Sequence, residues 1–455
     1  MEAALVRRLL KDRSRPVRVG LVGLGAMGRG ILYQTILTPG VECVAICDSN
    51  PEVMRDCARS FRIEHEAVSS IRQASTTIRN GKTALTTDGL LVAQCPDVDI
   101  LVEATSAIED GARFVVTAIE NGKHVVLMNA EIDLFFGPYF LELAQQNNVR
   151  VTSCDGDQHG VLKRVIDDMS LWGFEPVMAG NIKGYLDRYA DPEMIKPEAD
   201  KRRLDYKMCT AYTDGSKLSI EMAILANALD METLEPGMTG PRVADVTEVL
   251  GAFDFSAILD RMRNGGKPVV DYILGAQPGG GVYAVGYHED EFQSFMMDYY
   301  KMGPGPFYLF YRPYHLCHVE SLASIVGPVV LGESLLEPTY GFKTNTFSYG
   351  KRDLKAGETL DGIGGHACYG LIENVSENSH NGLPLGLAEH VELIRKVEKD
   401  QAIQLDDIVV PDRFDFDLFE RAIAASARLQ AIGAQPEPSS TEEQRQLLRA
   451  SFVVE

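Results

Sequence analysis

The most informative segment of the chain reads Val17-Arg18-Val19-Gly20-Leu21-Val22-Gly23-Leu24-Gly25-Ala26-Met27-Gly28. Its first six residues form a mostly apolar, β-branched run, as expected of a strand buried on both faces. Gly23, Gly25 and Gly28 follow at G-x-G-x-x-G spacing, which permits a tight turn, lets a pyrophosphate approach the backbone and allows close packing of helix on strand. A helix that begins at Ala26 and Met27 would point its free N–H groups at that pyrophosphate.

The next apolar run ends in an acid. Residues 41–47 predict a second strand, and Asp48 follows where a carboxylate can accept a hydrogen bond from a ribose hydroxyl. Strand, glycines, helix, strand and acid within one βαβ unit predict a dinucleotide-binding domain. Asp48 by itself favours NADH over NADPH, because it would repel a 2′-phosphate, unless Arg55 folds back over the site.

Alternating strands and helices continue to residue 153. The pattern predicts a parallel sheet of the Rossmann type over residues 1–153, with residues 64–89 as a polar insertion. Three polar residues follow predicted strands at the edge where a nicotinamide ring would lie. They are Thr105, Asn129 and Glu131.

Two further regions follow. Residues 154–340 predict an α+β catalytic and dimerisation domain, in which a helix at 314–325 returns to the nucleotide domain. Residues 341–455 contain short, glycine-punctuated strands that resemble the small β-rich SAF domain, and end in a polar, acidic tail. The predicted class is therefore α/β, with a Rossmann-type domain, an α+β domain and a SAF-like β-rich domain.

Composition excludes several functions. The formal net charge of the 455 residues is −21, which argues against nucleic acid as a partner. The eight cysteines contain no C-x-x-C pair, and we expect them to be reduced. The sequence shows neither a signal peptide nor a membrane-spanning segment, so we expect a cytoplasmic protein with no membrane partner.

Paired acids follow the last strand of the predicted sheet. Asp155 and Asp157 flank Gly156, and both could face one hard cation, Mg²⁺ or Mn²⁺. The alternative is a polar turn in which Asp157 caps the next helix.

A lysine opens an apolar helix further along. Asp214-Gly215-Ser216-Lys217 leads into that helix, and Glu221 follows one turn later. A lysine at the positive end of a helix dipole is unfavourable, so we expect a functional role, with a depressed pKa that makes Lys217 a proton donor or acceptor. Alternatively, Lys217 and Glu221 form an ordinary surface ion pair.

Other basic residues could bind a substrate. Arg312 leads into the segment predicted as a helix, and His315 and His318 lie within it; substrate contact or domain joining is favoured here over metal binding. Lys183 and Lys207 could supply positive charge for a phosphate.

These residues carry two family resemblances. The nucleotide domain, Asn129-Ala130-Glu131 and the helix after Asp214 resemble the homoserine dehydrogenase-like proteins, in which an acid and a lysine transfer protons; this implies catalytic roles for Asp214 and Lys217. Combined with the SAF-like region, the chain more closely resembles the deoxyxylulose phosphate reductoisomerase-like enzymes. That resemblance implies a homodimer, NADPH (with NADH as the alternative) and a divalent cation held by Asp155, Asp157 and Glu221, with Ser216 and Lys217 on the substrate.

The leading hypothesis is therefore a metal-assisted, NADPH-dependent reductoisomerase. It would convert 1-deoxy-D-xylulose 5-phosphate, a small phosphorylated sugar, to 2-C-methyl-D-erythritol 4-phosphate in isoprenoid precursor synthesis. The alternative is a metal-free NAD(P)-dependent dehydrogenase of homoserine, a polyol or a sugar acid with Lys217 as its acid or base. A third hypothesis is a nucleotide-sensing regulatory protein.

Overall fold

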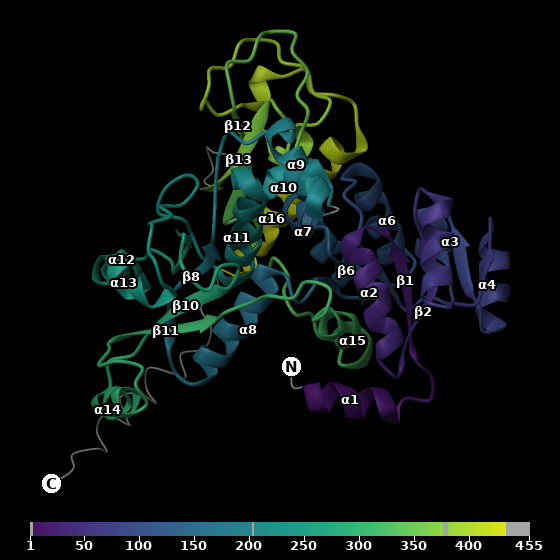
Figure 1. Cartoon of the computed structure of the whole chain (residues 1–455), viewed down its shortest axis with the longest axis horizontal. Coiled ribbons are helices and arrows are strands. Elements are labelled where there is room, and N and C mark those ends of the chain that lie inside the picture. Colours follow the sequence, from purple (N-terminus) through teal and green to yellow (C-terminus); the bar gives the residue numbers. More distant parts are fainter. Residues whose placement is uncertain (1–2, 203, 376–380, 434–455) are drawn as a thin grey trace.

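A computed structural model describes residues 3–202, 204–375 and 381–433. Figure 1 shows a nucleotide-binding lobe on one side, a mixed-sheet lobe on the other and a small β-rich region above them. The predicted tail after residue 435 lies outside the described residues. Within the described part, no helix combines the length and apolarity needed to cross a bilayer.

The first lobe is built on a seven-stranded parallel sheet in the order β3-β4-β2-β1-β5-β6-β7. This sheet and its helices confirm the α/β class and the Rossmann-type arrangement. Its strands are β1 (Val17–Val22), β2 (Val41–Cys47), β3 (His65–Ala67), β4 (Thr83–Thr86), β5 (Ile100–Glu103), β6 (His124–Leu127) and β7 (Val151–Ser153). Its helices are α1 (Ala3–Asp12), α2 (Ala26–Leu37), α3 (Pro51–Ser60), α4 (Ile71–Arg79), α5 (Gly89–Gln94), α6 (Glu109–Glu120) and α7 (Ala130–Gln146).

The prediction of a polar insertion at residues 64–89 is wrong. That segment adds β3, α4 and β4, and β4 pairs in parallel with β2 through Ala45 and Ala84. Each strand has four residues or fewer, so hydrophobic periodicity is too short to detect, and pairing with β2 is what makes them strands.

The second lobe carries a four-stranded sheet in the order β11-β10-β8-β9. Only β8 and β9 are parallel. The strands are β8 (Glu175–Lys183), β9 (Val269–Leu274), β10 (Val282–Tyr287) and β11 (Phe307–Arg312). The helices that follow β7 are α8 (Gln158–Leu171), α9 (Pro192–Arg202), α10 (Tyr206–Asp214), α11 (Ser216–Leu229), α12 (Val249–Ala252), α13 (Phe255–Arg263), α14 (Glu291–Tyr299) and α15 (Leu322–Val330), with a 3₁₀ turn at Val246–Glu248.

Helix α11 lies at the centre of the molecule. Its residues from Ser216 to Ala228 are all buried, because it packs against α7, α8, β9 and the hairpin β12 (Thr344–Gly350) and β13 (Cys368–Asn374). An apolar, uninterrupted sequence is what a helix enclosed on every side requires. The first turn of α11 is thereby carried into the interface between the lobes.

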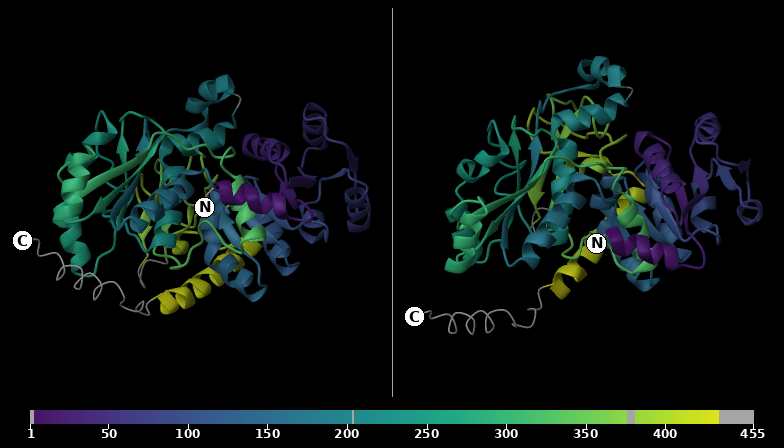
Figure 2. Two further views of the ribbon diagram at one scale, coloured as in Figure 1. Left: turned by 90° about the horizontal axis from the view of Figure 1, so that it is seen from below. Right: turned by 60° about the horizontal axis from the view of Figure 1, so that its bottom comes forward.

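The last region departs from the predicted series of short strands. Apart from β12 and β13, its described residues pair through isolated bridges such as Leu354–Val397 and Thr359–Glu392, with 3₁₀ turns at Leu385–Leu387 and Leu405–Asp407. Helix α16 (Phe414–Gly433), which the sequence analysis did not predict, packs on α7 of the first lobe. Figure 2 shows it lying along the side of that lobe.

Candidate active site

The glycine loop forms as its spacing predicts. Gly23 has φ +96°, and an added Cβ would lie 2.5 Å from the carbonyl oxygen of Ala104; at Gly28 it would lie 2.0 Å from the carbonyl oxygen of Gly23. Around the Cβ position of Gly25, by contrast, no atom lies within 4 Å. The chain needs the first and third glycines for its own packing, whereas the second leaves open space at the N-terminus of α2. That space fits the approach of a dinucleotide pyrophosphate.

Asp48 stands at the end of β2, beside this loop. Its carboxylate accepts hydrogen bonds from the backbone N–H of Leu24 at 2.8 Å and of Asn50 at 2.9 Å. Arg55 forms an ion pair with Glu52 on the same helix. Arg55 is therefore engaged on α3 and does not fold back to offset the charge of Asp48.

Side-chain hydrogen bonds hold the residues that follow β5 and β6 at the edge of the sheet. The N–H and Oγ1 of Thr105 both donate to Glu103. Asn129 caps α7, with Oδ1 accepting from the N–H of Ile132 at 3.3 Å and Nδ2 donating to the carbonyl of Ala107 at 3.2 Å. Burial raises the pKa of Glu103 to about 7, although the donors of Thr105 oppose the shift.

Glu103 should therefore make stability depend on pH. Its folded-state pKa of about 7 exceeds the ordinary 4.5, so its contribution is complete below pH 4.5 and is lost as pH rises through 7. Relative to Glu103→Gln, the wild-type chain should lose on the order of 2–3 kcal/mol of unfolding free energy between about pH 4.5 and 7.5. Urea unfolding at several pH values measures this difference. If the unfolding free energies of the two proteins change equally with pH, the prediction is contradicted.

Lys217 lies in a buried cluster of carboxylates. It is 7% exposed, and its Nζ lies 3.2 Å from Oε1 of Glu131, which follows β6. Asp157, after β7, and Glu221, one turn along α11, are buried beside it. The alternative of an ordinary surface pair between Lys217 and Glu221 is therefore wrong, because the lysine is enclosed and its ion-pair partner belongs to the nucleotide lobe.

The electrostatics differ from the predicted depressed pKa. Burial lowers the pKa of Lys217, but the carboxylates of Glu131, Asp157 and Glu221 outweigh it and raise the pKa above its usual range. Burial, followed by repulsion from Asp157, raises the pKa of Glu221 well above its ordinary value. Lys217 is thus a stable ammonium at neutral pH, which can donate a hydrogen bond and can yield its proton only to a strong base such as a developing alkoxide.

Lys183, which was predicted to supply positive charge, and three residues outside the predicted site complete the cluster. The burial of His159 lowers its pKa to about 4, so the imidazole is neutral. Burial raises the pKa of the Tyr212 hydroxyl and of the Cys317 thiol. Nζ of Lys183 donates to the carbonyl of Tyr212 at 2.6 Å, and burial lowers the pKa of this lysine. For the unpredicted residues, the sequence signals were the position of His159 two residues after Asp157 and that of Cys317 between His315 and His318.

The predicted helix at 314–325 is wrong in its first half. Residues 313–321 form a non-helical strap, and α15 begins at Leu322. Arg312 and Arg164 both pair with Glu320 across this strap. It does lead back to the nucleotide lobe as expected, since a Cβ at Gly30 of α2 would lie 2.3 Å from the ring of His318. His315 reaches the cluster instead, facing Asp157 and His159.

Other predicted residues lie elsewhere. Asp155 faces Arg164 at 3.2 Å, and it lines a separate cleft of about 1060 Å³ beside α1. Its carboxylate is not brought together with Asp157 and Glu221, which corrects the predicted metal triad. The donors present therefore do not fit Mg²⁺ or Mn²⁺ held by those three acids.

Three more predicted residues connect the lobes to the last region. Asp214 pairs with Nζ of Lys351 at 2.8 Å, and Oγ of Ser216 accepts from the N–H of Gly370 at 2.8 Å. Lys207 pairs with Glu389 at 3.0 Å. Because their polar atoms are engaged in these contacts, the geometry gives each of the three a structural role.

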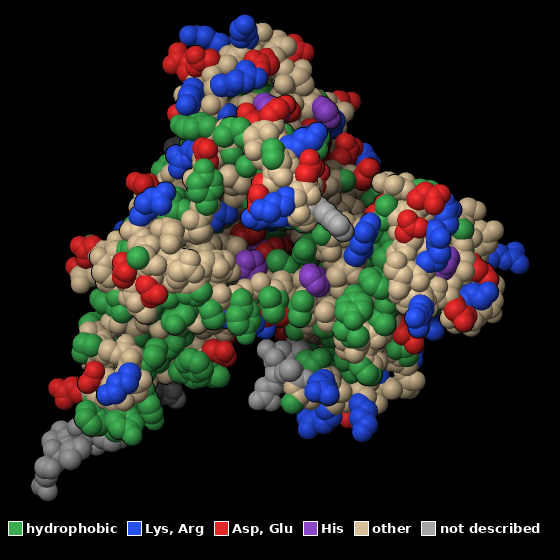
Figure 3. All heavy atoms as spheres, viewed as in Figure 1, with side chains coloured by type: hydrophobic (Ala, Val, Ile, Leu, Met, Phe, Trp, Pro, Cys, Tyr) green, Lys and Arg blue, Asp and Glu red, His purple; other side chains and the backbone are tan. Residues whose placement is uncertain are grey.

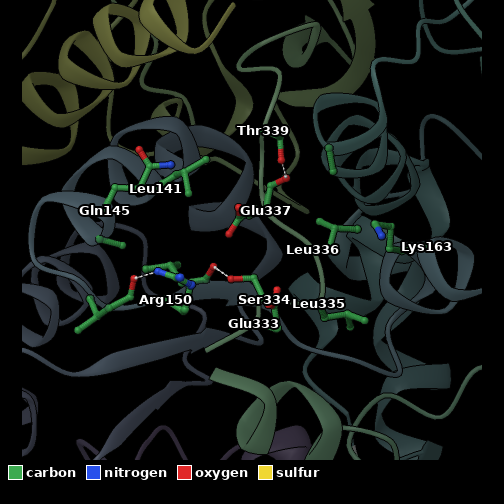
Figure 4. A pocket seen from close by; sticks show the side chains of 14 residues that line it. Leu141, Gln145, Arg150, Lys163, Glu333, Ser334, Leu335, Leu336, Glu337 and Thr339 are labelled. Atoms are coloured by element: carbon green, nitrogen blue, oxygen red, sulfur yellow. Dashed lines mark hydrogen bonds between the residues drawn. The ribbon is translucent and has the colours of Figure 1, made fainter. Parts of the chain in front are cut away.

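The cavity in Figure 4 is distinct from this cluster. It measures about 400 Å³ and lies between the end of α7, the start of β7 and residues 333–339. It contains none of the predicted site residues. The molecular face in Figure 3 is instead hollowed between the lobes, with acidic and histidine side chains in the hollow.

Comparison with known proteins defines the class. A family described as "Oxidoreductase family, NAD-binding Rossmann fold" matches residues 17–127, and "Oxidoreductase DRL, catalytic domain" matches residues 156–321. Each match covers less than half of the chain, and together they indicate an oxidoreductase built on an NAD-binding Rossmann fold.

Individual relatives are more distant. A homoserine dehydrogenase of Methylobacillus glycogenes is 31% identical over 132 residues, which cover 29% of this chain and 29% of that protein. The solved homoserine dehydrogenase of Thiobacillus denitrificans is 16% identical, covers 76% of this chain and 84% of its own, and has a TM-score of 0.44. The 1-deoxy-D-xylulose 5-phosphate reductoisomerase of Zymomonas mobilis, solved with NADPH, is 15% identical over 46% of this chain and 57% of its own, with a TM-score of 0.32. The chain thus aligns in sequence with under a third of the homoserine dehydrogenase from Methylobacillus.

Proposed function

We propose that this protein is a dehydrogenase that transfers hydride between a nicotinamide cofactor and a hydroxyl or carbonyl group of a small polar metabolite. The observation that carries this proposal is the buried ammonium of Lys217, held between Glu131 and Asp157 at the edge where β6 and β7 end. The sequence relatives support the dehydrogenase alternative better than the reductoisomerase, because they are homoserine dehydrogenases.

The residues suggest a simple proton route. When bound, the nicotinamide supplies or accepts the hydride. In the reducing direction, Lys217 donates a hydrogen bond to the carbonyl oxygen and transfers a proton to it as negative charge develops. Glu131 holds the ammonium in place before the transfer.

The charges favour a substrate rich in hydroxyl or ammonium groups. Glu131 and Asp157 offer acceptors to such groups. Lys207, predicted to supply charge for a phosphate, is paired with Glu389, and Arg312, predicted to contact the substrate, is paired with Glu320. A phosphorylated sugar therefore has less support than a polyol or a hydroxy amino acid such as homoserine, whose ammonium and hydroxyl groups suit these acceptors.

Substrate assays separate the hypotheses. NADH and NADPH oxidation should be followed with aspartate semialdehyde, the oxidised form of homoserine, and with deoxyxylulose phosphate, each with EDTA or with Mg²⁺. Turnover of the semialdehyde or of another non-phosphorylated carbonyl compound is the expected result. Turnover of deoxyxylulose phosphate only with Mg²⁺ would instead establish the reductoisomerase.

Asp48 should set the cofactor preference. Because its carboxylate stands beside the glycine loop and Arg55 is paired with Glu52, we expect tighter binding of NADH than of NADPH. Asp48→Asn keeps the size and one acceptor oxygen but removes the charge, and should shift the ratio of the two Kd values about tenfold toward NADPH. Fluorescence titration measures both constants. Asp56→Asn, a change on the outer surface of α3, should leave the ratio unaltered; an NADPH preference in the wild type would overturn the prediction.

The homodimer stays a prediction with a candidate surface. Helix α14 exposes Phe292, Phe295 and Tyr299, Tyr300 directly after it is also exposed, and Figure 3 shows hydrophobic side chains gathered at that corner. Large exposed apolar patches mark interfaces, and among the described residues β11 is an outermost strand of the four-stranded sheet. Sedimentation should give the mass of two chains for the wild type and of one chain for Phe295→Glu; a monomeric wild type would contradict this.

A further inference from the structure

Three different metal-ligating side chains meet beside Lys217. One ligand atom of each of Asp157, His315 and Cys317 lies within 4.8 Å of those of the other two. The thiol of Cys317 lies 3.8 Å from Oδ1 of Asp157. The aspartate comes from the turn after β7 and the other two from the strap, so the fold unites residues about 160 positions apart.

The ring of His315 is oriented by a backbone carbonyl. Its Nδ1 lies 2.7 Å from the carbonyl oxygen of Gly280. A carbonyl can only accept, so Nδ1 carries a proton, which leaves Nε2 as the ring nitrogen that could bind a metal. Metal-binding histidines characteristically donate their other ring N–H to such a group, which fixes the tautomer.

The backbone holds the two segments in contact. Gly156 has φ +88°, and an added Cβ would lie 2.5 Å from the carbonyl oxygen of Cys317 and 2.6 Å from that of Leu316. The pairing of Glu320 with Arg164 and Arg312 fixes the strap on the other side. The three donors are thus preorganised rather than brought together by chance rotamers.

From this arrangement we propose that Asp157, His315 and Cys317 bind a borderline divalent cation such as Zn²⁺. A set of one oxygen, one nitrogen and one sulfur suits Zn²⁺ and does not suit Mg²⁺, which prefers oxygen alone. The carboxyl groups of Asp157, Glu131 and Glu221 outnumber the amino groups of Lys217 and Lys183, which favours an added cation. Three protein ligands leave a coordination position open, as in catalytic zinc sites. If the proposed dehydrogenase reaction holds, that position is available to the substrate oxygen.

Cobalt substitution tests the site without any turnover assay. The full-length chain, treated with EDTA and dialysed, is titrated with Zn²⁺ by calorimetry and with Co²⁺ by absorption. We expect one high-affinity equivalent per chain and a thiolate-to-cobalt charge-transfer band. Cys317→Ala should remove the band, and Cys317→Ala and His315→Ala should each weaken Zn²⁺ binding at least about tenfold, since even outer partners of a metal site contribute that much.

Two controls match these variants. Cys209→Ala removes another half-buried thiol, and His366→Ala removes the histidine of the more exposed group Asp191, Glu193 and His366. Neither should alter the band. Two results would overturn the proposal even if dehydrogenase turnover is found. One is loss of Zn²⁺ or Co²⁺ binding in His366→Ala, and the other is Co²⁺ binding without a charge-transfer band that depends on Cys317. If the cobalt band is intact but no substrate is turned over, the proposed dehydrogenase function is refuted and the metal site stands.

Discussion

Replacement of Lys217 by alanine should lower kcat by about 10²–10⁴-fold, the range of a lost general acid, while cofactor affinity changes less than about twofold. The reason is position: Lys217 is the buried ammonium at the ends of β6 and β7, whereas the glycine loop lies at the end of β1. Steady-state kinetics on the substrate identified above and a fluorescence titration with NADH measure the two quantities.

A structural effect of this substitution has to be separated from a chemical one. Loss of the ammonium leaves Glu131 without its buried partner, at a cost of about 3–5 kcal/mol. The double variant Lys217→Ala/Glu131→Gln removes both charges and should recover most of the stability but none of the activity. Unaltered activity in Lys217→Ala would refute the catalytic role. A chain that binds cofactor but turns over no substrate, with or without Lys217, would favour the nucleotide-sensing regulator.

Two substitutions in the glycine loop should act in opposite ways. Gly28→Ala places a Cβ 2.0 Å from a backbone oxygen that cannot move aside, so it should cost at least about 3 kcal/mol of unfolding free energy. Gly25→Ala meets no atom within 4 Å and should leave stability within about 0.5 kcal/mol. The same methyl group fills the space that the pyrophosphate needs, and should raise the Kd for NADH at least about tenfold.

Thermal or urea unfolding and cofactor titration of both variants check this pair. The Gly25 variant is the informative one, because it separates folding from binding. Normal cofactor affinity in Gly25→Ala would mean that the pyrophosphate does not approach this loop. Unimpaired stability in Gly28→Ala would mean that α2 does not pack on the loop as the structure has it.

Local patterns predicted the first lobe well and the strap poorly. The apolar run at residues 17–22 predicts a strand, and the glycine spacing predicts the turn after it. The βαβ unit can therefore be predicted from the sequence. The segment with His315 and His318 has helical spacing, yet Glu320 pairs with Arg164 and Arg312 and holds it as an irregular strap. Those partners lie on α8 and β11, which a window of neighbouring residues does not contain.

The residues of the candidate site show the same division. Lys217, Glu221, Glu131 and Asp157 were all singled out from local signals, and the structure brings them together. Asp155, equally prominent in the sequence, faces the other side of its turn, toward Arg164. The direction of the pKa shift of Lys217 was predicted wrongly because it depends on how many carboxylates surround the ammonium.

The order of residues was enough to establish a parallel sheet with a nucleotide loop, because strand, turn and helix propensities act over a few neighbouring positions. Only the tertiary structure decided which carboxylates face Lys217, which histidine lies beside them and which lysine and arginine side chains are paired with acids far away in the sequence. Electrostatic interactions depend on distance through space, and α11 carries Lys217 to Glu131, 86 positions away along the chain.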